Sequence, residues 1–478
     1  MDEKMKLSGT AKASYGLAAV GKDMVYMLSA SYVLYYFQDL LGVSAAAMGV
    51  ILLVARVFDA FNDPIMGAIV AKTRTKWGKF RPWLLIGTIT NALVLILMFA
   101  APPSLSPGGL VAYAAVTYIL WGVTYTMMDI PYWSMIPAFT EGGKERENLT
   151  TLARTCAGVG SALITVVTVV SVSGLGHLFG KAGITDREVE IVGFKYFSII
   201  VAVLFIAFIT ICCLNVKEKS TTEMKTASIG EMFKALIQND QAMAVVVAIV
   251  VVNCSIYITS NLVIYFFKYD VGGVRWRGNY TTFSIFGGAM QILSMMIFYP
   301  VLRKFFTSIR IYFISIGMAI TGYITLLLIS SIAVPNVYIL FIPAFFIFSA
   351  NGMLSVITTV FLANTVDYGE LKNGRRDESV IFSMQTFVVK LASGISAMIA
   401  ALALEILSLS RDTEETLDEG VDYSLNVLAS QKMGLRMTMT IIPIIGLIFA
   451  IFWFKKRYSL TDEKIGEIEN ELLKAKKD

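Results

Sequence analysis

Histidine and cysteine are scarce in this sequence. Among 478 residues there is one histidine, His177, and there are four cysteines. One histidine cannot form a chain of titrating imidazoles across a membrane. The cysteines fall within apolar stretches and lack the spacing of zinc ligands or of a disulfide framework. They are Cys156, Cys212, Cys213 and Cys254. The sequence also has no Gly-x-x-x-x-Gly-Lys-Ser/Thr phosphate-binding loop.

Charge is scarce as well. Only 16% of the residues are charged, whereas 56% are apolar, and the mean hydropathy is +0.68. This composition excludes an ordinary soluble protein of this length. Because a membrane-spanning helix needs about 20 mainly apolar residues, the pattern predicts an all-α integral membrane protein with twelve transmembrane helices. The predicted spans begin near Tyr15, Ala45, Pro82, Leu110, Thr151, Phe194, Met243, Tyr280, Ile309, Asn336, Ser379 and Met433.

Most of the lysines and arginines lie in the two termini and in alternate predicted loops. Short cytoplasmic loops are enriched in basic residues, so we expect both termini to be cytoplasmic in a multi-pass protein of the inner (plasma) membrane. The net charge of +5 is explained by the lipid bilayer with its anionic headgroups, and we expect no nucleic-acid partner. Residues 1–14 are polar, so we expect no cleavable signal peptide.

The longest polar interruption divides the predicted spans into six and six. We expect an N-terminal six-helix bundle at 1–215, a cytoplasmic linker at 216–242, a C-terminal six-helix bundle at 243–455 and a cytoplasmic tail at 456–478. Two bundles of this kind are typical of secondary carriers, which hold substrate near the membrane midplane. The tail contains an amphipathic pattern that could lie on the membrane or against a bundle. We expect a functional monomer.

Three polar residues interrupt the second predicted span, namely Asp59, Asn62 and Asp63. Their spacing places them on one helical face. Ionised side chains at membrane depth are costly and usually handle ions or substrate. Two adjacent carboxylates there favour either a proton or a bound cation between them, and Thr126 could add a hydroxyl ligand. The alternative is a static salt bridge with Arg56, although one arginine cannot neutralise two acids.

A second set of polar and aromatic residues suggests carbohydrate binding. Carboxylates and arginine can hydrogen-bond to neighbouring hydroxyls, and an aromatic ring can cover the apolar face of a sugar. The set consists of Asp23, Tyr125, Asp129, Trp133 and Arg154 in the first half and Gln385, Thr386 and Lys390 in the second. The aromatic residues could equally be packing residues. A membrane enzyme acting on lipid-linked sugar is the rival reading, but its acids would lie at an interfacial cleft, so we expect no enzymatic activity.

Several long blocks of sequence resemble the glycoside-pentoside-hexuronide:cation symporters of the major facilitator superfamily. These blocks are Gly-Lys-Asp at 21–23, Ala-Arg-Val-Phe-Asp-Ala-Phe-Asn-Asp-Pro-Ile-Met-Gly at 55–67, Lys-Trp-Gly-Lys-Phe-Arg-Pro-Trp at 76–83, Tyr-Ile-Leu-Trp-Gly-Val-Thr-Tyr-Thr-Met-Met-Asp-Ile-Pro-Tyr-Trp-Ser at 118–134, Asp-Tyr-Gly-Glu-Leu-Lys at 367–372 and Ser-Met-Gln-Thr-Phe-Val-Val-Lys at 383–390. The resemblance extends from about Tyr15 to the last span. It implies a major-facilitator fold that carries a sugar inward with Na+, Li+ or H+, by alternating access and without a further cofactor.

The resemblance also implies a role for individual residues. The cation site would consist of Asp59, Asn62, Asp63 and Thr126, and because the asparagine and the threonine are both present, we expect Na+ coupling. The sugar site would consist of Lys22, Asp23, Tyr125, Asp129, Trp133, Arg154, Gln385, Thr386, Val389 and Lys390.

The chain departs from the family pattern in the tenth span. Where melibiose-transporting members have a tryptophan that faces the sugar, this chain has Ser355, and a nearby acid is replaced by Asn364. The substrate is expected to be a glycoside such as melibiose or a related galactoside. A hexuronide or glucuronide, a pentoside, and a membrane sugar sensor that does not transport remain alternatives.

The basic loop at 72–81 suggests a cytoplasmic latch, in which Arg81 pairs with Glu147 or Asp367. The alternative is that the loop's basic residues only set the membrane orientation.

Overall fold

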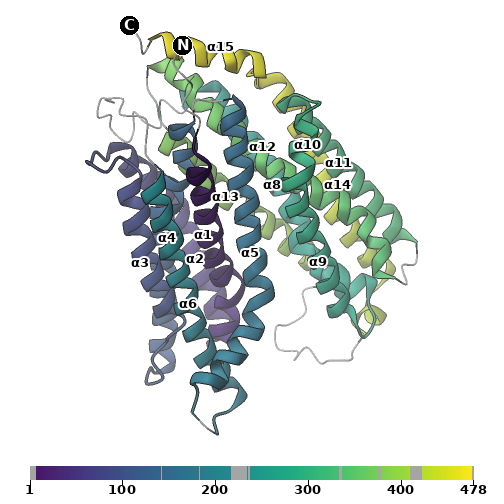
Figure 1. The fold of residues 1–478 in the computed structure, drawn as a ribbon. Helices are drawn as coiled ribbons and strands as arrows, with labels where there is room; N and C mark the ends of the chain where they lie inside the picture. Colours follow the sequence, from purple (N-terminus) through teal and green to yellow (C-terminus); the bar gives the residue numbers. More distant parts are fainter. Residues whose placement is uncertain are drawn as a thin grey trace. The chain divides into compact units, whose positions relative to one another are not determined.

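The chain is almost entirely helical in the computed structural model, which describes residues 7–140, 143–181, 183–216, 234, 237–332, 336–374, 378–409 and 422–475. Within these ranges there is no β-strand, and a long helix lies at each of the twelve predicted spans (Figure 1). The helices are α1 (Gly9–Leu34), α2 (Ala45–Lys72), α3 (Arg81–Met98), α4 (Pro107–Phe139), α5 (Gly143–Phe179), α6 (Asp186–Asn215), α8 (Asp240–Tyr265), α9 (Trp276–Leu293) with α10 (Tyr299–Arg303), α11 (Ser308–Ser331), α12 (Phe341–Asn373), α13 (Glu378–Ile406), α14 (Ala429–Arg457) and the tail helix α15 (Asp462–Ala475).

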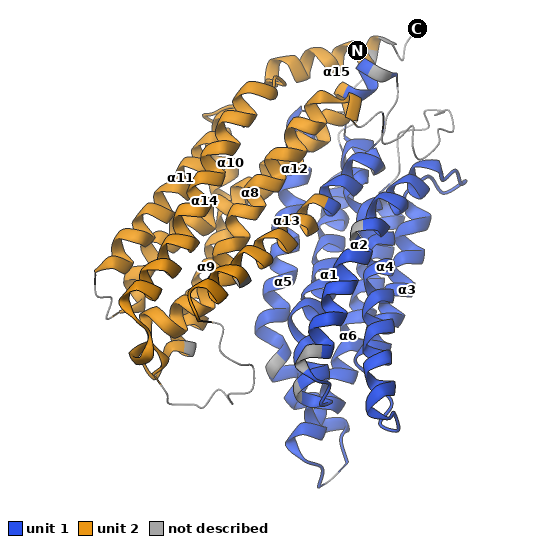
Figure 2. Cartoon of the chain, turned by 180° about the vertical axis from the view of Figure 1, so that it is seen from behind, with its two compact units in different colours: residues 1–236, 369–387 blue, residues 237–368, 388–478 orange. Residues whose placement is uncertain are grey.

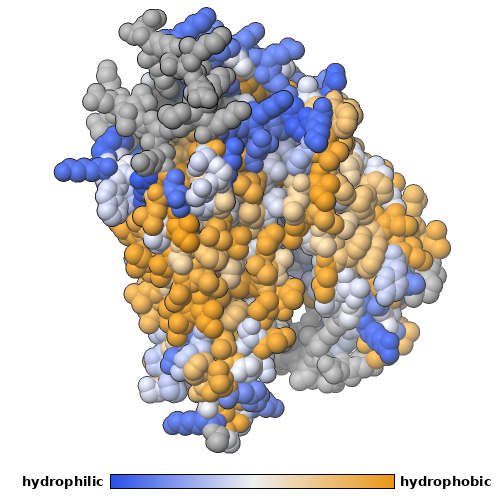
Figure 3. Space-filling view, viewed as in Figure 1, coloured by the Kyte–Doolittle hydropathy of each residue, from blue (hydrophilic) through white to orange (hydrophobic). Residues whose placement is uncertain are grey.

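Ten of the described segments are long and apolar enough to cross a membrane. The remaining two, α1 and α2, have 26 and 28 residues but carry the ionisable residues that the sequence analysis singled out. Apolar side chains gather over the middle of the long helices and polar ones at their ends (Figure 3). The chain is therefore an all-α, multi-pass membrane protein, as predicted.

Two compact units make up the chain (Figure 2). Unit 1 contains Met1–Leu236 and Gly369–Phe387, and unit 2 contains Ile237–Tyr368 and Val388–Asp478. The end of α12 and the first part of α13 thus belong to unit 1. Most of the predicted linker, residues 217–233 and 235–236, lies outside the described residues, and the domain boundaries expected from sequence stay a prediction.

Helix α1 lies between α5 and α6 in unit 1, while α4 packs against α2 and α3. Small residues allow the close approach, as is common between membrane helices. A Cβ atom built on Gly160 of α5 would lie 2.3 Å from the carbonyl oxygen of Val20 on α1. Any larger residue at position 160 would push these two helices apart.

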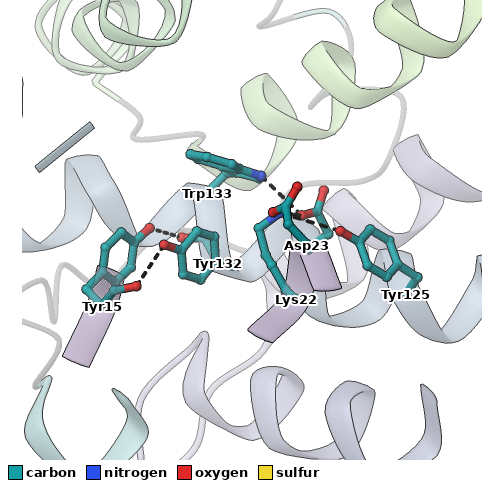
Figure 4. Close-up of polar contacts among 7 residues, drawn as sticks. Tyr15, Lys22, Asp23, Tyr125, Tyr132 and Trp133 are labelled. Atoms are coloured by element: carbon teal, nitrogen blue, oxygen red, sulfur yellow. Dashed lines mark hydrogen bonds and ion pairs between the residues drawn. The ribbon is translucent and has the colours of Figure 1, made fainter. Parts of the chain in front are cut away.

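Two tyrosines join α1 to α4 in a reciprocal arrangement (Figure 4). The hydroxyl of Tyr15 donates to the carbonyl oxygen of Tyr132 at 2.5 Å, and the hydroxyl of Tyr132 donates to the carbonyl oxygen of Tyr15 at 2.9 Å. Their rings stack with centroids 4.4 Å apart. Both residues are at most 1% exposed, so this tyrosine clasp fixes the register of α1 against α4.

In unit 2, α14 packs against α8 and α11. A partly buried ion pair ties α14 to the π-helical segment Phe266–Val271 that continues α8, because Arg436 donates to both carboxylate oxygens of Asp270 at 2.6 Å each. The side chain of Asp270 is 2% exposed. Paired, planar contacts of this kind are among the stronger charge-assisted hydrogen bonds.

The tail helix α15 packs against the protein through its apolar face. Ile465 and Ile468 are buried there, at 7% and 6% exposure. At its first residue, Asp462 accepts from Arg303 at 2.9 Å and from the backbone N–H of Ser308 at 3.4 Å. Of the two positions left open by the sequence, the described residues therefore support the one against the helices.

Replacing Tyr132 with Phe should lower stability by about 0.5 to 1.5 kcal/mol, because the hydroxyl bond to the carbonyl oxygen of Tyr15 is lost while this carbonyl keeps its bond within α1. The measurement is thermal unfolding of the purified protein for Tyr132→Phe, Tyr15→Phe and the double variant. Non-additive losses are expected because the two bonds share one register. Strict additivity would show that the bonds act independently.

Replacing Arg436 with Ala should destabilise the protein by about 3 to 5 kcal/mol, because the carboxylate of Asp270 would stay buried without this guanidinium. Thermal unfolding of Arg436→Ala measures the loss. The double variant Arg436→Met/Asp270→Leu should recover most of the stability. If it stays as unstable as Arg436→Ala, the loss comes from packing of the arginine rather than from the stranded charge.

Candidate functional site

The acids of α2 face a small residue and a hydroxyl on α4. Thr126 donates to a carboxylate oxygen of Asp63 at 2.8 Å. Asp63 is fully buried and Thr126 is 3% exposed. A Cβ atom built on Gly122 would lie 2.6 Å from a carboxylate oxygen of Asp59, so this carboxylate rests directly on the α4 backbone. The structure thus brings Asp59, Asp63 and Thr126 together.

The contact at Gly122 was not predicted, although the sequence contained a signal for it. Asp59 and Asp63 are four residues apart on α2, and Gly122 and Thr126 are four residues apart on α4. Residues four apart occupy adjacent turns of the same helix face. Because the two spacings are equal, Asp59 meets Gly122 and Asp63 meets Thr126.

Asn62 lies beside these acids on α2. Its amide nitrogen is buried and has no acceptor among the described residues. Rotation of the amide by 180° would exchange its nitrogen and oxygen, so the side chain can present an oxygen ligand instead. Arg56 interacts electrostatically with Asp59 and hydrogen-bonds to Tyr26, so the predicted alternative of an arginine partner applies to Asp59.

The oxygen atoms of Asp59, Asn62, Asp63 and Thr126 are suited to coordinate a small monovalent cation. Two carboxylates, one amide and one hydroxyl are hard oxygen ligands. In the described part of the chain, no group of three or more His, Cys, Asp or Glu side chains could hold a metal ion.

Lys22 is the centre of the second cluster (Figure 4). Its ammonium group lies 2.8 Å from a carboxylate oxygen of Asp23 and 2.9 Å from one of Asp129. It also reaches the hydroxyl of Tyr125 at 3.5 Å. Lys22 is 3% exposed, and a lysine is rarely buried to this extent without paired charges. The three helices that carry Lys22, Asp129 and Arg154 are α1, α4 and α5.

Trp133 is held between charged groups of this cluster. Its indole N–H donates to Asp129 at 3.1 Å. The guanidinium carbon of Arg154 lies 3.9 Å from the centre of the ring, a cation–π distance. The ring is thereby fixed in orientation beside hydrogen-bonding groups of both signs. Sugar sites need this combination of a rigid aromatic surface with charged donors and acceptors.

The predicted sugar ligands of the second half lie on α13. Gln385 is buried, and Thr386 donates to the carbonyl oxygen of Ser383 at 2.8 Å. Both belong to unit 1, whereas Val389 and Lys390, one turn further along the helix, belong to unit 2. Their approach to the Lys22 cluster stays a prediction.

The two departures from the family pattern lie on α12 in unit 2. Thr359 donates to the backbone carbonyl oxygen of Ser355 at 2.9 Å, and Asn364 is buried at 7% exposure.

The loop before α3 makes a different contact from the predicted latch. Lys79 pairs with Glu378 at 3.3 Å, and the side chain of Glu378 is 2% exposed. Sequence reasoning missed this partner. The sequence did contain a signal for Glu378. It stands in the first turn of α13, and the first turn of a helix stabilises a negative charge.

The three predicted latch residues are all placed by the structure. Arg81 donates to the carbonyl oxygen of Val216 at the end of α6. Glu147 on α5 and Asp367 on α12 are both buried. Pairing of Arg81 with either acid stays a prediction.

Comparison with known proteins identifies the family. The family model described as "MFS/sugar transport protein" matches residues 14–462. The isoprimeverose transporter of Lactiplantibacillus pentosus is 29% identical, and the alignment covers 82% of this chain and 79% of the transporter's length. The lactose permease of Lactobacillus delbrueckii subsp. bulgaricus is 26% identical, covering 98% and 73%. The glucuronide carrier protein homolog of Escherichia coli is 26% identical, covering 99% and 97%.

A solved structure supports the fold. The proton:xylose symporter XylE, bound to 6-bromo-6-deoxy-D-glucose, superimposes with a TM-score of 0.63, covering 96% of this chain and 98% of its own at 14% identity. Identity this low shows the fold alone. The family match, however, covers nearly the whole chain and agrees with the resemblance carried by the sequence blocks. The chain belongs to the MFS/sugar transport protein family, the glycoside-pentoside-hexuronide:cation symporters of the major facilitator superfamily, and is a transporter rather than an enzyme.

Proposed function

We propose that this protein imports a neutral glycoside, such as a galactoside of the melibiose type, together with Na+. Li+ and H+ are the alternative coupling ions. The cation occupies the site formed by Asp59, Asn62, Asp63 and Thr126, and the sugar binds beside Trp133. The protein acts in the inner membrane with both termini in the cytoplasm.

The single observation that carries this proposal is the arrangement of residues along α4. Thr126 bonds to Asp63 at 2.8 Å, and one turn further along the same helix Asp129 bonds to Lys22 at 2.9 Å. A cation that binds the α2 acids competes for the hydroxyl of Thr126 and so acts on the turn that holds Asp129. One rigid helix therefore connects the two clusters.

Charge favours a neutral sugar. Two cationic residues, Lys22 and Arg154, and two acidic ones, Asp23 and Asp129, make up the ionised groups of the Lys22 cluster, so its formal charge is balanced. A glucuronide would add one negative charge to this cluster, which is costly in a medium of low dielectric constant unless Lys390, the further cationic residue of the proposed sugar site, compensates it. The similarity to a glucuronide carrier homolog keeps the hexuronide as the second candidate.

The proposed transport cycle is alternating access, in which the binding site opens in turn to each side of the membrane. Neutralisation of the α2 acid pair by the cation favours the conformation that binds sugar, and the loaded carrier then reorients. Such coupling must be reciprocal, and a coupling of about 1 to 3 kcal/mol changes each affinity by about 5- to 150-fold.

We expect Na+ to tighten glycoside binding and the glycoside to tighten Na+ binding by the same factor. The measurement is equilibrium binding of both ligands to the purified protein, alongside uptake of labelled glycosides into proteoliposomes under separate Na+, Li+ and H+ gradients. Asp59→Asn/Asp63→Asn should retain sugar binding but lose gradient-driven accumulation. Sugar affinity that is indifferent to all three ions would refute the coupling. Binding without accumulation in the unmodified protein would instead indicate a sensor.

Gly122→Ala should weaken Na+ binding, because the new methyl group would displace the carboxylate of Asp59 from its place on α4. Moving a side chain off its preferred rotamer costs about 0.5 to 1.5 kcal/mol. A free-energy loss of this size corresponds to a loss of about 2- to 10-fold in Na+ affinity. The matched control is Gly49→Ala on α2, where a Cβ atom meets nothing within 4 Å. The Na+ dependence of uptake measures both variants, and equal Na+ affinities in the two would contradict a cation site at Asp59.

A further inference from the structure

An apolar groove runs along the outside of unit 1 between α1, α5 and α6. Its volume is about 510 Å³, within the range of sites that hold small molecules, about 300 to 1,000 Å³. Its lining includes Met24 on α1, Leu163, Gly174 and Leu178 on α5, and Phe197 and Leu204 on α6. We call it the α5–α6 groove. None of its lining residues belongs to the two clusters described above.

The chemistry of the lining excludes a polar occupant. Of the twelve lining residues, Ser171 alone has a polar side chain. A water molecule needs two to four polar partners to stay in a buried site. A sugar, whose hydroxyl groups need still more partners, is excluded on the same ground.

The groove is continuous with the surface that faces lipid. Leu178 is 72% exposed and Ile200 is 44% exposed, although both line the groove. The neighbouring residues Val166 and Val170 on α5 are 71% and 76% exposed. In a membrane-spanning protein such apolar residues face hydrocarbon. The molecules that reach this groove are therefore the lipids of the bilayer.

The length and position of the groove fit one leaflet. From Leu163 to Leu178 the helix rises about 22 Å, at about 1.5 Å per residue. One leaflet spans about 20 to 22 Å when its headgroup region is included, because the whole bilayer is about 40 to 45 Å thick. Leu178 is the last residue but one of α5, whereas Leu163 and Met24 lie near the middle of their helices. The groove thus extends from one membrane surface to the midplane.

Residues at the surface end suit a lipid headgroup. Phe179 of α5 stacks on Tyr196 of α6 with ring centroids 4.2 Å apart. The exposed ammonium group of Lys195 lies 5.8 Å from the ring of Tyr196. Tyrosine and lysine are common anchors at the membrane–water boundary, and an ammonium group there can meet a phosphate.

We propose that the α5–α6 groove binds one acyl chain of a phospholipid from the leaflet at the α5–α6 loop, with its phosphate near Lys195. The inner end of the chain packs against Met24, the residue that follows Asp23 on α1. A bilayer lipid thereby completes the packing of the turn of α1 that carries Lys22 and Asp23. This site is independent of the identity of the sugar and of the coupling ion.

A glycine supplies the variant that tests this site. Gly174 lines the groove, and a Cβ atom built on it meets nothing within 4 Å, so the side chain of Gly174→Leu would begin in open space at the groove. Leucine is also a better helix former than glycine, which favours folding. The matched control is Gly317→Leu on α11, where a Cβ atom likewise meets nothing within 4 Å and which does not line the groove. Val167→Phe fills the groove from a second position.

The experiment uses the full chain in vesicles of phosphatidylethanolamine and phosphatidylglycerol with a trace of phosphatidylethanolamine that carries a photoreactive diazirine in mid-chain. After irradiation, peptide mass spectrometry maps the labelled residues. We expect peptides of α5 and α6 to be labelled above those of α3, which also exposes apolar residues. Gly174→Leu should reduce this labelling at least about fivefold, equivalent to about 1 kcal/mol, and Gly317→Leu should not.

Two results would overturn the proposal. One is equal labelling of all helices that expose apolar residues, which would mean general contact with lipid. The other is unchanged labelling in folded Gly174→Leu or, if thermal unfolding shows that this variant is unfolded, in folded Val167→Phe. Loss of sugar uptake in any variant bears on neither result, because the readout is lipid labelling alone.

Discussion

The burial of Lys22 between Asp23 and Asp129 is the constraint on which the rest of unit 1 depends. Taking an ammonium group out of water costs several kcal/mol unless opposite charges and hydrogen bonds surround it. Asp129 lies on another helix, so α1 and α4 can pack only in the register that brings the two residues to 2.9 Å. The tyrosine clasp enforces the same register two turns away. Apolar packing alone would allow α1 and α4 to slide.

The same helix, α4, carries the contacts of both polar clusters. Thr126 contacts Asp63 on α2, and Tyr125 and Asp129 contact Lys22 on α1. The two clusters thus share one helix, α4. A movement of α4 relative to both α1 and α2 would change the environments of Lys22 and of Asp63 together. In the proposed function, the helix itself is the physical link through which a cation on α2 would alter the affinity for a sugar beside Trp133.

Much of the fold and part of the site could be predicted from the sequence, for a physical reason. Mainly apolar runs predicted all twelve long helices, because lipid demands about 20 mainly apolar residues per span, although α1 and α2 carry charged residues within their runs. The energetic cost of charge at membrane depth singled out Asp59 and Asp63, whereas Asp129 was indicated by carbohydrate chemistry and Lys22 by the family resemblance. The contact of Gly122 with Asp59, the bond between Tyr15 and Tyr132 and the pairing of Lys79 with Glu378 depend on interhelical register, which no single-helix pattern encodes.

The polarity of α1 is tolerated because of where this helix lies. It has neighbours in α5 and α6 and close backbone contact at Gly160, so its charged turn faces protein groups that neutralise it. A large apolar opening beside that turn is the α5–α6 groove at Met24. An empty groove there would forfeit dispersion contacts on one side of α1. A lipid chain restores those contacts without adding a polar group, so a helix too polar to span a membrane alone is enclosed by protein on its charged side and by hydrocarbon at Met24.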